Sequence, residues 1–464
     1  MHRALNLDIL CYMIIFLENR DIFRLSVTHR SAYEALLPLT WSTLVFTDCD
    51  LALRCCRSLA VNKDRMRFVR RLLVSYWCIL PYPPTRPTSL VPFLSEFLRL
   101  AINLRSVDIR LLEQPGFCTP EIIEPLTCLH QLSTMALGLM TTTNCHYLSR
   151  LRTKCLRSIE LEIDERLTNI TDFLRPFQAT LEEVRLNLWA PPTVHFASVS
   201  VHLVINNGDI WPHVHTLELK GISVLAPSTL VHAFPQVRSL RVYNQRRHSL
   251  RDRRPCIWPS LALVESNSLD ALDELVDWEH TGHLDRLDLS AASVPWRKGR
   301  ENMPWGSAIE IPRLEEVLRW TSPNAFSLAL VVPMPPSFFD MLKIAAPQLG
   351  HLGIYFYEWQ SPSFNKHFED KELGDLLPFG MEELPITSFR LHLHVCDRLQ
   401  RRIKNIVSER FLPKLPHVEY VHYKSHSDNE DTTWRIIRNA EGSVQLSDVP
   451  DDQQYALKQR GGFA

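Results

Sequence analysis

The chain has 464 residues and carries 51 basic against 52 acidic residues, a net charge of −1. An apolar content of 45% permits a large core and excludes a wholly disordered chain. The near-zero charge gives no general attraction to nucleic acid. Glycine is scarce, at 14 residues, and neither G-x-G-x-x-G nor G-x-x-x-x-G-K-[ST] occurs, which excludes the common phosphate-binding loops.

The first residues predict three short helices. Asn6 caps an apolar helix that runs to Leu17, Asn19 caps a second, and Thr28 or Ser31 begins a third that stops before Pro38. Three helices of this size do not bury all their apolar side chains against one another. We therefore expect either the rest of the chain or a partner to cover them.

The apolar run from Ile9 to Leu17 does not predict a membrane segment. It is much shorter than the roughly 20 residues that a spanning helix needs, and no longer apolar run follows. Asp8 interrupts its start, and no small-residue cleavage site follows it, so we expect no signal peptide.

This segment resembles an F-box. The resemblance lies in Leu5-Asn6-Leu7-Asp8-Ile9-Leu10, Ile14, Leu17, Asp21-Ile22, Leu25, Val27, Arg30, Tyr33 and Trp41. Asn6, Asp8 and Tyr33 depart from the Pro, Glu and Trp of the family pattern. The resemblance implies that residues 1–46 bind a Skp-type adaptor, and through it a cullin. The implied adaptor contacts are Leu5, Leu7, Ile9, Ile14, Leu17, Ile22, Leu25, Val27 and Trp41. The alternative is an ordinary helical cap on the body that follows.

From Trp41 onward, an apolar-x-x-apolar-x-apolar pattern recurs that resembles the strand of a leucine-rich repeat. Its middle residues are Leu44, Leu72, Val107, Met135, Ile159, Val184, Leu217, Leu240, Leu287, Leu352, Phe389 and Val421, with weaker versions at Leu261-Val264 and Leu314-Val317. The spacing is irregular, from 23 residues (Leu217 to Leu240) to 37 residues (Leu352 to Phe389).

Helices are predicted between these strands, for example over residues 92–101, 168–179 and 338–345, and prolines such as Pro235 and Pro347 punctuate the start of several strands. We therefore predict an α/β fold in which a three-helix F-box-like module precedes a leucine-rich-repeat-like solenoid over residues 47–424, with parallel strands inside and helices outside. The alternative is a conventional α/β domain.

Side chains alternate along a strand, so residues that flank the apolar pair face the open surface of such a sheet. Their mixture of arginine, aromatic and charged side chains is typical of protein-recognition surfaces. The predicted contacts to an unknown target protein are Arg185, Lys220, Arg241, Tyr243, Asp288, Tyr355, Arg390 and His392.

Two further segments stand outside this pattern. A basic run between Arg246 and Arg254 predicts a solvated loop, with acidic-segment recognition or nuclear import as minor interpretations. Residues 425–464 predict an acidic loop, a terminal hairpin over 432–438 and 443–447, and a polar tail.

The spacing of the eleven cysteines predicts neither a disulfide framework nor a metal site. Their number is odd, no C-x-x-C occurs, and Cys55 and Cys56 are adjacent, which is typical of reduced thiols in a cytoplasmic or nuclear protein. His392, His394 and Cys396 share one face of a predicted strand, but neighbours on that face lie about 7 Å apart, too far for three ligands of one ion.

No G-x-S-x-G, H-E-x-x-H or nucleophilic cysteine signature occurs, so we expect no catalytic residues, no metal and no cofactor. The F-box resemblance implies a substrate-recognition subunit of a Skp–cullin–F-box ubiquitin ligase that binds proteins rather than nucleic acid or membrane. The alternatives are a repeat-based interaction scaffold without a ligase role and an enzyme of unfamiliar type.

Overall fold

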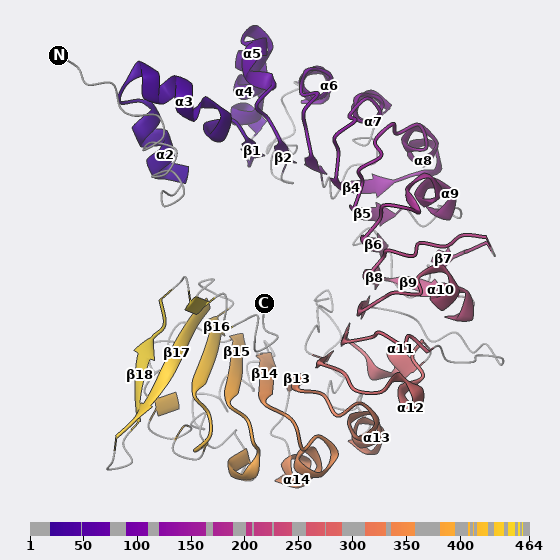
Figure 1. The fold of residues 1–464 in the computed structure, drawn as a ribbon, viewed down its shortest axis with the longest axis vertical. Coiled ribbons are helices and arrows are strands. Elements are labelled where there is room, and N and C mark those ends of the chain that lie inside the picture. The colour runs from indigo at the N-terminus through magenta and orange to yellow at the C-terminus, as the bar shows by residue number, and fades with distance from the viewer. Residues whose placement is uncertain are drawn as a thin grey trace, which may run out of the picture. The chain divides into compact units, whose positions relative to one another are not determined.

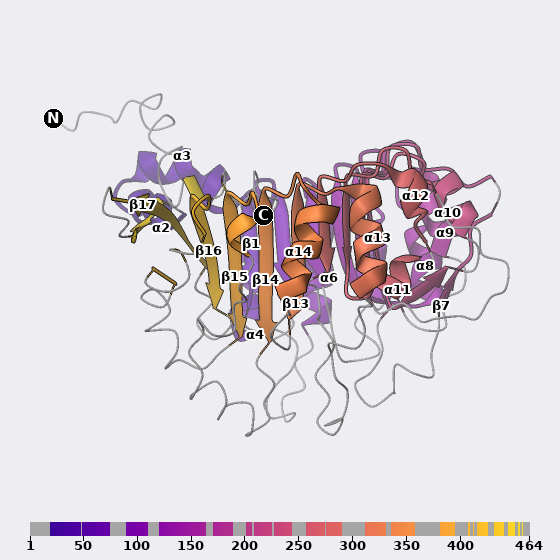
Figure 2. The same cartoon turned by 90° about the horizontal axis from the view of Figure 1, so that it is seen from below.

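The fold is known from a computed structural model (Figures 1 and 2). It describes residues 19–47, 49–74, 90–109, 120–163, 170–188, 201–206, 208–224, 227–243, 257–273, 275–289, 311–330, 336–357, 381–394, 407–408, 412, 415–425, 431–439, 444–450, 453–454 and 457. The chain forms two compact units, one of residues 1–225 and 232–235, the other of residues 226–231 and 236–464. The division falls inside the predicted repeat body.

Two helices open the described part of the first unit. Helix α2 (Asn19–Ser26) and helix α3 (Arg30–Thr40) pack through Ile22 and Leu36, which are 8% and 0% exposed. The His29 side chain caps α3 by accepting a hydrogen bond from the backbone N–H of Ser31 at 3.2 Å. The prediction that this helix stops before Pro38 is wrong. Pro38 lies in the last turn, where its missing N–H removes only one hydrogen bond.

The first unit contains a parallel sheet with the strand order β1-β2-β3-β4-β5-β6-β8. These strands are β1 (Thr43–Phe46), β2 (Arg71–Val74), β3 (Ser106–Ile109), β4 (Thr134–Met140), β5 (Ser158–Ile163), β6 (Glu183–Leu188) and β8 (Thr216–Lys220). The intervening helices are α4 (Cys49–Val61), α5 (Lys63–Met66), α6 (Val91–Leu100), α7 (Pro120–Leu126), α8 (Thr142–Leu148) and α9 (Ile170–Leu174), which continues as the 3-10 turn η2 (Arg175–Phe177). The helices lie on one face of the sheet (Figure 1).

The register confirms the predicted strands. Leu44 pairs with Leu72, Leu72 with Val107, and Val107 with Met135, so the middle residues of the predicted repeats lie side by side. Each of these side chains is at most 9% exposed, because it points from the sheet toward the helices. Predicted helix 92–101 is confirmed by α6, whereas predicted helix 168–179 is shorter and changes to a 3-10 turn at Arg175.

A repeated backbone contact stacks each strand on the preceding one. The carbonyl oxygen of the residue before a strand accepts two backbone N–H donors from the next repeat; for example, Ser42 accepts from Arg70 at 2.8 Å and from Arg71 at 2.9 Å. Within the first unit, the acceptors that follow this pattern are Ser42, Arg70, Arg105, Ser133, Arg157 and Glu182. Each repeat therefore satisfies backbone groups that its neighbour leaves open.

A short insertion precedes β8. Strand β7 (Val201–Leu203) pairs in parallel with β9 (Ile222–Val224), a small sheet that the sequence did not predict. Asp209, 3% exposed, accepts hydrogen bonds from Arg175 at 2.7 and 3.1 Å. Trp211 is fully buried, stacks on Phe234 at 5.0 Å, and donates its indole N–H to the Leu174 carbonyl at 3.1 Å. These contacts fasten the insertion to α9 and η2.

The second unit contains a sheet with the order β10-β11-β12-β13-β14-β15-β16-β17-β18, parallel through β16. Its strands are β10 (Ser239–Tyr243), β11 (Leu263–Ser266), β12 (Arg286–Leu289), β13 (Ala325–Leu330), β14 (His351–Tyr357), β15 (Ser388–His394), β16 (Tyr420–Ser425), β17 (Asp431–Arg438) and β18 (Val444–Asp448). Its helical segments are α11 (Leu269–Asp273), α12 (Trp278–Thr281), α13 (Ile311–Thr321), α14 (Pro336–Ala345) and η4 (Met381–Glu383), and α10 (Pro227–Ala233) crosses the boundary between the units in the chain.

Strands β17 and β18 are antiparallel, so the predicted terminal hairpin is confirmed, and it pairs with β16. The weak strand predicted at Leu314-Val317 is wrong. These residues lie in α13, where Leu314, Val317, Leu318 and Thr321 are buried at helical spacing. The strand at this place in the order is β13, whose Phe326 pairs with Leu287 and Leu352.

Candidate protein-interaction surface

In each unit one face of the sheet packs against helices and the other carries polar side chains. Burial alternates along β5, β6 and β8, with half-buried side chains at the first, third and fifth positions. Parallel register aligns these positions across strands, so Glu160, Arg185 and Glu218 form one row. The sheet therefore presents ordered rows of polar groups.

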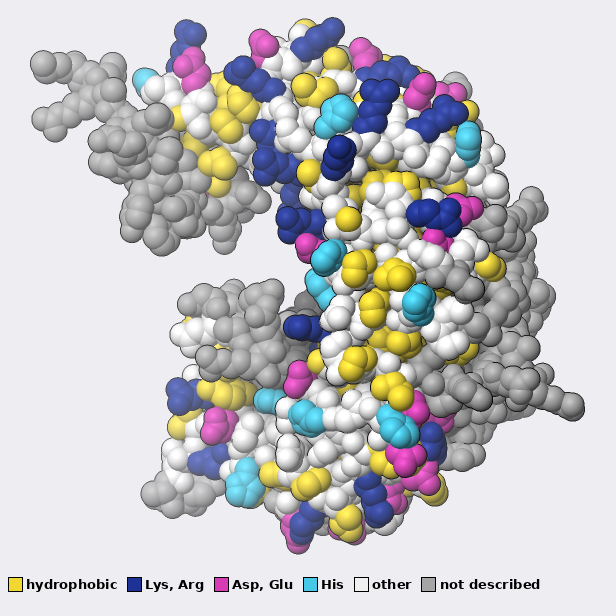
Figure 3. Space-filling view, turned by 45° about the vertical axis from the view of Figure 1, so that its right-hand side comes forward, with side chains coloured by type: hydrophobic (Ala, Val, Ile, Leu, Met, Phe, Trp, Pro, Cys, Tyr) yellow, Lys and Arg dark blue, Asp and Glu magenta, His cyan; other side chains and the backbone are white. Residues whose placement is uncertain are grey.

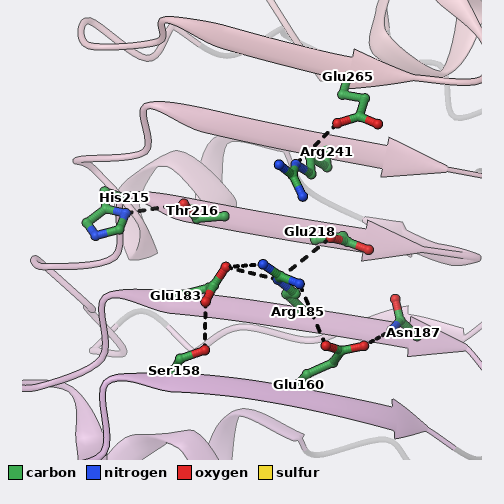
Figure 4. A network of polar contacts seen from close by, with 10 residues as sticks. All are labelled: Ser158, Glu160, Glu183, Arg185, Asn187, His215, Thr216, Glu218, Arg241 and Glu265. Atoms are coloured by element: carbon green, nitrogen blue, oxygen red, sulfur yellow. Dashed lines mark hydrogen bonds and ion pairs between the residues drawn. The ribbon is translucent and has the colours of Figure 1, made fainter. Parts of the chain in front are cut away.

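Arg185 lies at the centre of a network on this face of the first unit (Figure 4). Its Nε and Nη2 donate to one oxygen of Glu183 at 2.9 and 2.5 Å. Carboxylate oxygens of Glu160 and Glu218, from the strands on either side, lie 3.8 and 3.9 Å from its guanidinium nitrogens. Burial lowers the pKa of Arg185, but the hydrogen bonds and charges of these three carboxylates outweigh it, so the pKa is raised.

Two polar side chains extend the network. The Ser158 hydroxyl donates to Glu183 at 2.6 Å, and the Asn187 amide donates to Glu160 at 3.2 Å. Hydrogen bonds thus join β5 to β6, and the ion pair between Arg185 and Glu218 extends the network to β8 (Figure 4). Sequence reasoning selected Arg185 but missed Ser158 and Glu160, although they flank Ile159 as Glu183 and Arg185 flank Val184.

The corresponding face of the second unit carries separate ion pairs. Arg241 on β10 pairs with Glu265 on β11 at 3.2 Å (Figure 4), and Arg286 pairs with Asp288 two residues along β12. Because Arg286 and Asp288 have side chains that are 12% and 2% exposed, this pair is enclosed.

Aromatic and histidine side chains gather on β14 to β17 of this unit. The Tyr355 and His392 rings meet edge to face at 5.0 Å, and the Arg390 guanidinium lies 5.6 Å from the Tyr355 ring centroid. His422 is 2% exposed and its Nδ1 lies 3.0 Å from the Thr433 hydroxyl. Burial lowers the pKa of His351 at the start of β14.

The structure corrects three of the predicted target contacts. Tyr243 and Tyr355 are each 9% exposed and Asp288 is 2% exposed, so none of the three is presented to solvent. Tyr355 is covered by its ring contacts, and the charge of Asp288 is satisfied within its own strand. The predicted contacts that remain partly exposed are Arg185, Lys220, Arg241, Arg390 and His392.

Among the predicted adaptor contacts, Leu5, Leu7, Ile9, Ile14 and Leu17 lie outside the described residues. Ile22 belongs to the buried contact between α2 and α3, and Leu25 packs beside it. Val27 is 68% exposed just after α2. Trp41 is half-buried, and the Arg65 guanidinium lies 5.3 Å from its ring centroid.

The described residues place no three metal-ligating side chains together as a metal site. None of the described helices has the length and apolar character that crossing a bilayer requires. The basic run between Arg246 and Arg254 lies outside the described residues. What the polar face offers chemically is a set of fixed charges and hydrogen-bonding groups in parallel rows.

Comparison with protein-family models finds no family that matches this chain, and comparison with curated proteins finds no match either.

Proposed function

We propose that the chain is a substrate-recognition subunit of a Skp–cullin–F-box ubiquitin ligase. In this proposal, residues 1–46 bind a Skp-type adaptor, and the sheet surface of the body binds a target protein. The chain carries out no bond chemistry of its own. Its contribution is proximity, because it holds the target where a separate conjugating enzyme reaches it.

The observation that carries the proposal is the surface of the helical pair. Ile22 and Leu36 already form the contact between α2 and α3, yet Val27 and Leu39 remain 68% and 44% exposed. A segment that served only as a cap on the repeat body needs a polar outer face. In this proposal, the adaptor covers these two exposed aliphatic side chains.

The body supports a binding role. Strands that follow one another in register, each joined to the last through a shared carbonyl acceptor, are typical of a solenoid built from repeats. We infer that the body is leucine-rich-repeat-like. A sheet of this type leaves one face open, and in the first unit that face holds the network around Arg185.

Co-purification with a purified Skp-type adaptor tests the proposal. Val27→Asp places a charge on the exposed surface and is expected to weaken adaptor binding about tenfold or more without unfolding the chain. Val61→Asp is the matched control, because Val61 is 83% exposed at the end of α4 and its substitution should leave binding intact.

A third variant separates folding from binding. Ile22→Ala empties part of the contact with Leu36 and is expected to destabilise the helical pair by roughly 2 kcal/mol.

If the wild-type chain is folded and monodisperse but does not bind the adaptor, the ligase role is refuted. The body then remains an interaction scaffold, the second function that its fixed polar network favours.

A further inference from the structure

Arginines collect where the first strands of the sheet begin. Arg70 directly precedes β2, Arg71 is its first residue, and Arg105 directly precedes β3. The backbone N–H of Arg105 donates to the Arg70 carbonyl at 2.8 Å, which fixes the two residues side by side. Since neighbouring strands lie about 4.8 Å apart, the three side chains start from one small area.

Two of these side chains are exposed, and among the described residues no carboxylate pairs with any of the three. Arg71 and Arg105 are exposed, while Arg70 is half-buried and donates to the Asn103 carbonyl at 3.2 Å. In the described part of the chain none of the three forms an ion pair with a carboxylate. Guanidinium groups without a carboxylate partner among the described residues are available to pair with an anionic segment.

The surrounding charge has the same sign. Over residues 49–74 and 90–109, the basic residues are Arg54, Arg57, Lys63, Arg65, Arg67, Arg70, Arg71, Arg99 and Arg105, and the acidic ones are Asp50, Asp64, Glu96 and Asp108. The chain as a whole has a net charge of −1, so the excess is local. Figure 3 shows Lys and Arg side chains gathered over the first unit in the upper part of the view.

An exposed aliphatic pair adjoins these arginines. Val45 and Leu73 are register partners on β1 and β2, and they are 48% and 37% exposed. Leu73 follows Arg71 by two residues, so both side chains lie on the same open face of the sheet, as does Asp108, the register partner of Leu73. Arg70 and Arg105 lie at the edge of this face, where β2 and β3 begin. Aliphatic side chains beside cations suit a protein segment. Single-stranded nucleic acid is typically held by aromatic platforms on which its bases stack.

We propose that this surface, formed by Val45, Leu73, Arg70, Arg71 and Arg105, binds an acidic segment of a partner protein that also carries an aliphatic side chain. The carboxylates of the segment pair with the guanidinium groups, and its aliphatic side chain covers Val45 and Leu73. The inference rests on the proposed function in one respect: the acidic segment is taken to belong to the target protein of the proposed ligase.

Fluorescence anisotropy with the full chain tests the surface. The probe is a labelled Glu/Asp-rich peptide with two central leucines. It is compared with a serine-for-leucine version, a Lys/Arg-rich version and a single-stranded oligonucleotide of equal charge. The acidic leucine peptide is expected to bind most tightly of the four probes. Its affinity should fall as the salt concentration rises, because salt screens exposed ion pairs.

Variants locate the binding. Arg71→Glu with Arg105→Glu should weaken the acidic peptide at least about tenfold, and Leu73→Ser should weaken it several-fold. The matched control reverses the same number of charges at Arg54 and Arg99, which are exposed on α4 and α6, and should leave binding unchanged. Circular dichroism confirms that each variant is folded.

The inference is overturned if the acidic peptide shows no saturable binding, or if the control variant loses as much peptide affinity as the Arg71→Glu, Arg105→Glu variant. It is also overturned if the oligonucleotide binds as tightly as the peptide and the Arg71→Glu, Arg105→Glu variant no longer binds it. Adaptor co-purification of the Arg71→Glu, Arg105→Glu variant should stay normal. If the wild-type chain binds the peptide but no adaptor, the ligase role fails while the surface stands. If the wild-type chain binds the adaptor but not the peptide, the proposed surface fails while the ligase role stands.

Discussion

Replacing Arg185 with methionine removes the charge at the centre of the network on the first unit while keeping a side chain of similar reach. The variant loses two hydrogen bonds to Glu183, at 2.9 and 2.5 Å, and the attraction to Glu160 and Glu218 at 3.8 and 3.9 Å. The three carboxylates then lie on adjacent strands without the guanidinium between them.

The magnitude follows from the geometry. A hydrogen bond to a charged group contributes about 1.5–3 kcal/mol when it is protected from solvent. The Arg185 side chain is 34% exposed, so solvent screening reduces this to roughly 1–2 kcal/mol for the pair with Glu183. The two longer contacts add a few tenths of a kcal/mol each, as partly exposed ion pairs do. We expect Arg185→Met to lower the free energy of unfolding by about 2 kcal/mol.

Urea denaturation followed by circular dichroism measures the loss, and native-state hydrogen exchange at the amides of β6 localises it. Arg54→Met is the matched control, since Arg54 is exposed and donates to the Asp50 carbonyl at 3.4 Å without an ion pair among the described residues. It should change stability by less than about 0.5 kcal/mol. In a double-mutant cycle, Arg185→Met and Glu218→Gln should couple by about 0.5 kcal/mol. Strict additivity, or equal losses at Arg54 and Arg185, would refute the reasoning.

Two further predictions concern the insertion before β8. Trp211→Phe leaves the Leu174 carbonyl without its indole donor and should lower the free energy of unfolding by roughly 1–3 kcal/mol in urea denaturation, whereas no change would mean that this hydrogen bond does not hold the insertion. The hydrogen bond from Arg175 holds the pKa of Asp209 below its ordinary value, so its stabilising effect is complete above about pH 4, the unfolded pKa, and is lost as the pH falls through the lower folded pKa. Asp209→Asn should therefore destabilise the chain at neutral pH and progressively less in acid, and a difference that stays constant with pH would contradict this.

Strand positions were predictable because each inner residue must be apolar to face the helices. The pattern around Val107 and Ile159 meets this requirement, and both lie where expected. The same spacing failed at Leu314, because residues three apart also share one face of a helix, and α13 uses that face. At β13 the first position of the apolar pattern is occupied by Pro323, so residues 323–328 do not match the pattern.

Exposure on the open face was less predictable. Alternation places Asp288 on that face correctly, but it does not reveal that Arg286 folds along the strand and encloses it. Tyr355 is covered by His392, its register partner on β15. The repeat pattern predicted both strands, but it does not show that the two rings lie against each other. The insertion sheet of β7 and β9 was missed because each of these strands is too short to show a period.

The most direct test of the central claim is a titration of the purified full-length chain with a purified Skp-type adaptor, read by size-exclusion chromatography with light scattering. We expect a stable complex of one chain with one adaptor, whose affinity Val27→Asp lowers about tenfold or more and Val61→Asp leaves unchanged. A folded chain that elutes alone at every adaptor concentration, or a complex that forms equally well with Val27→Asp, would contradict this expectation.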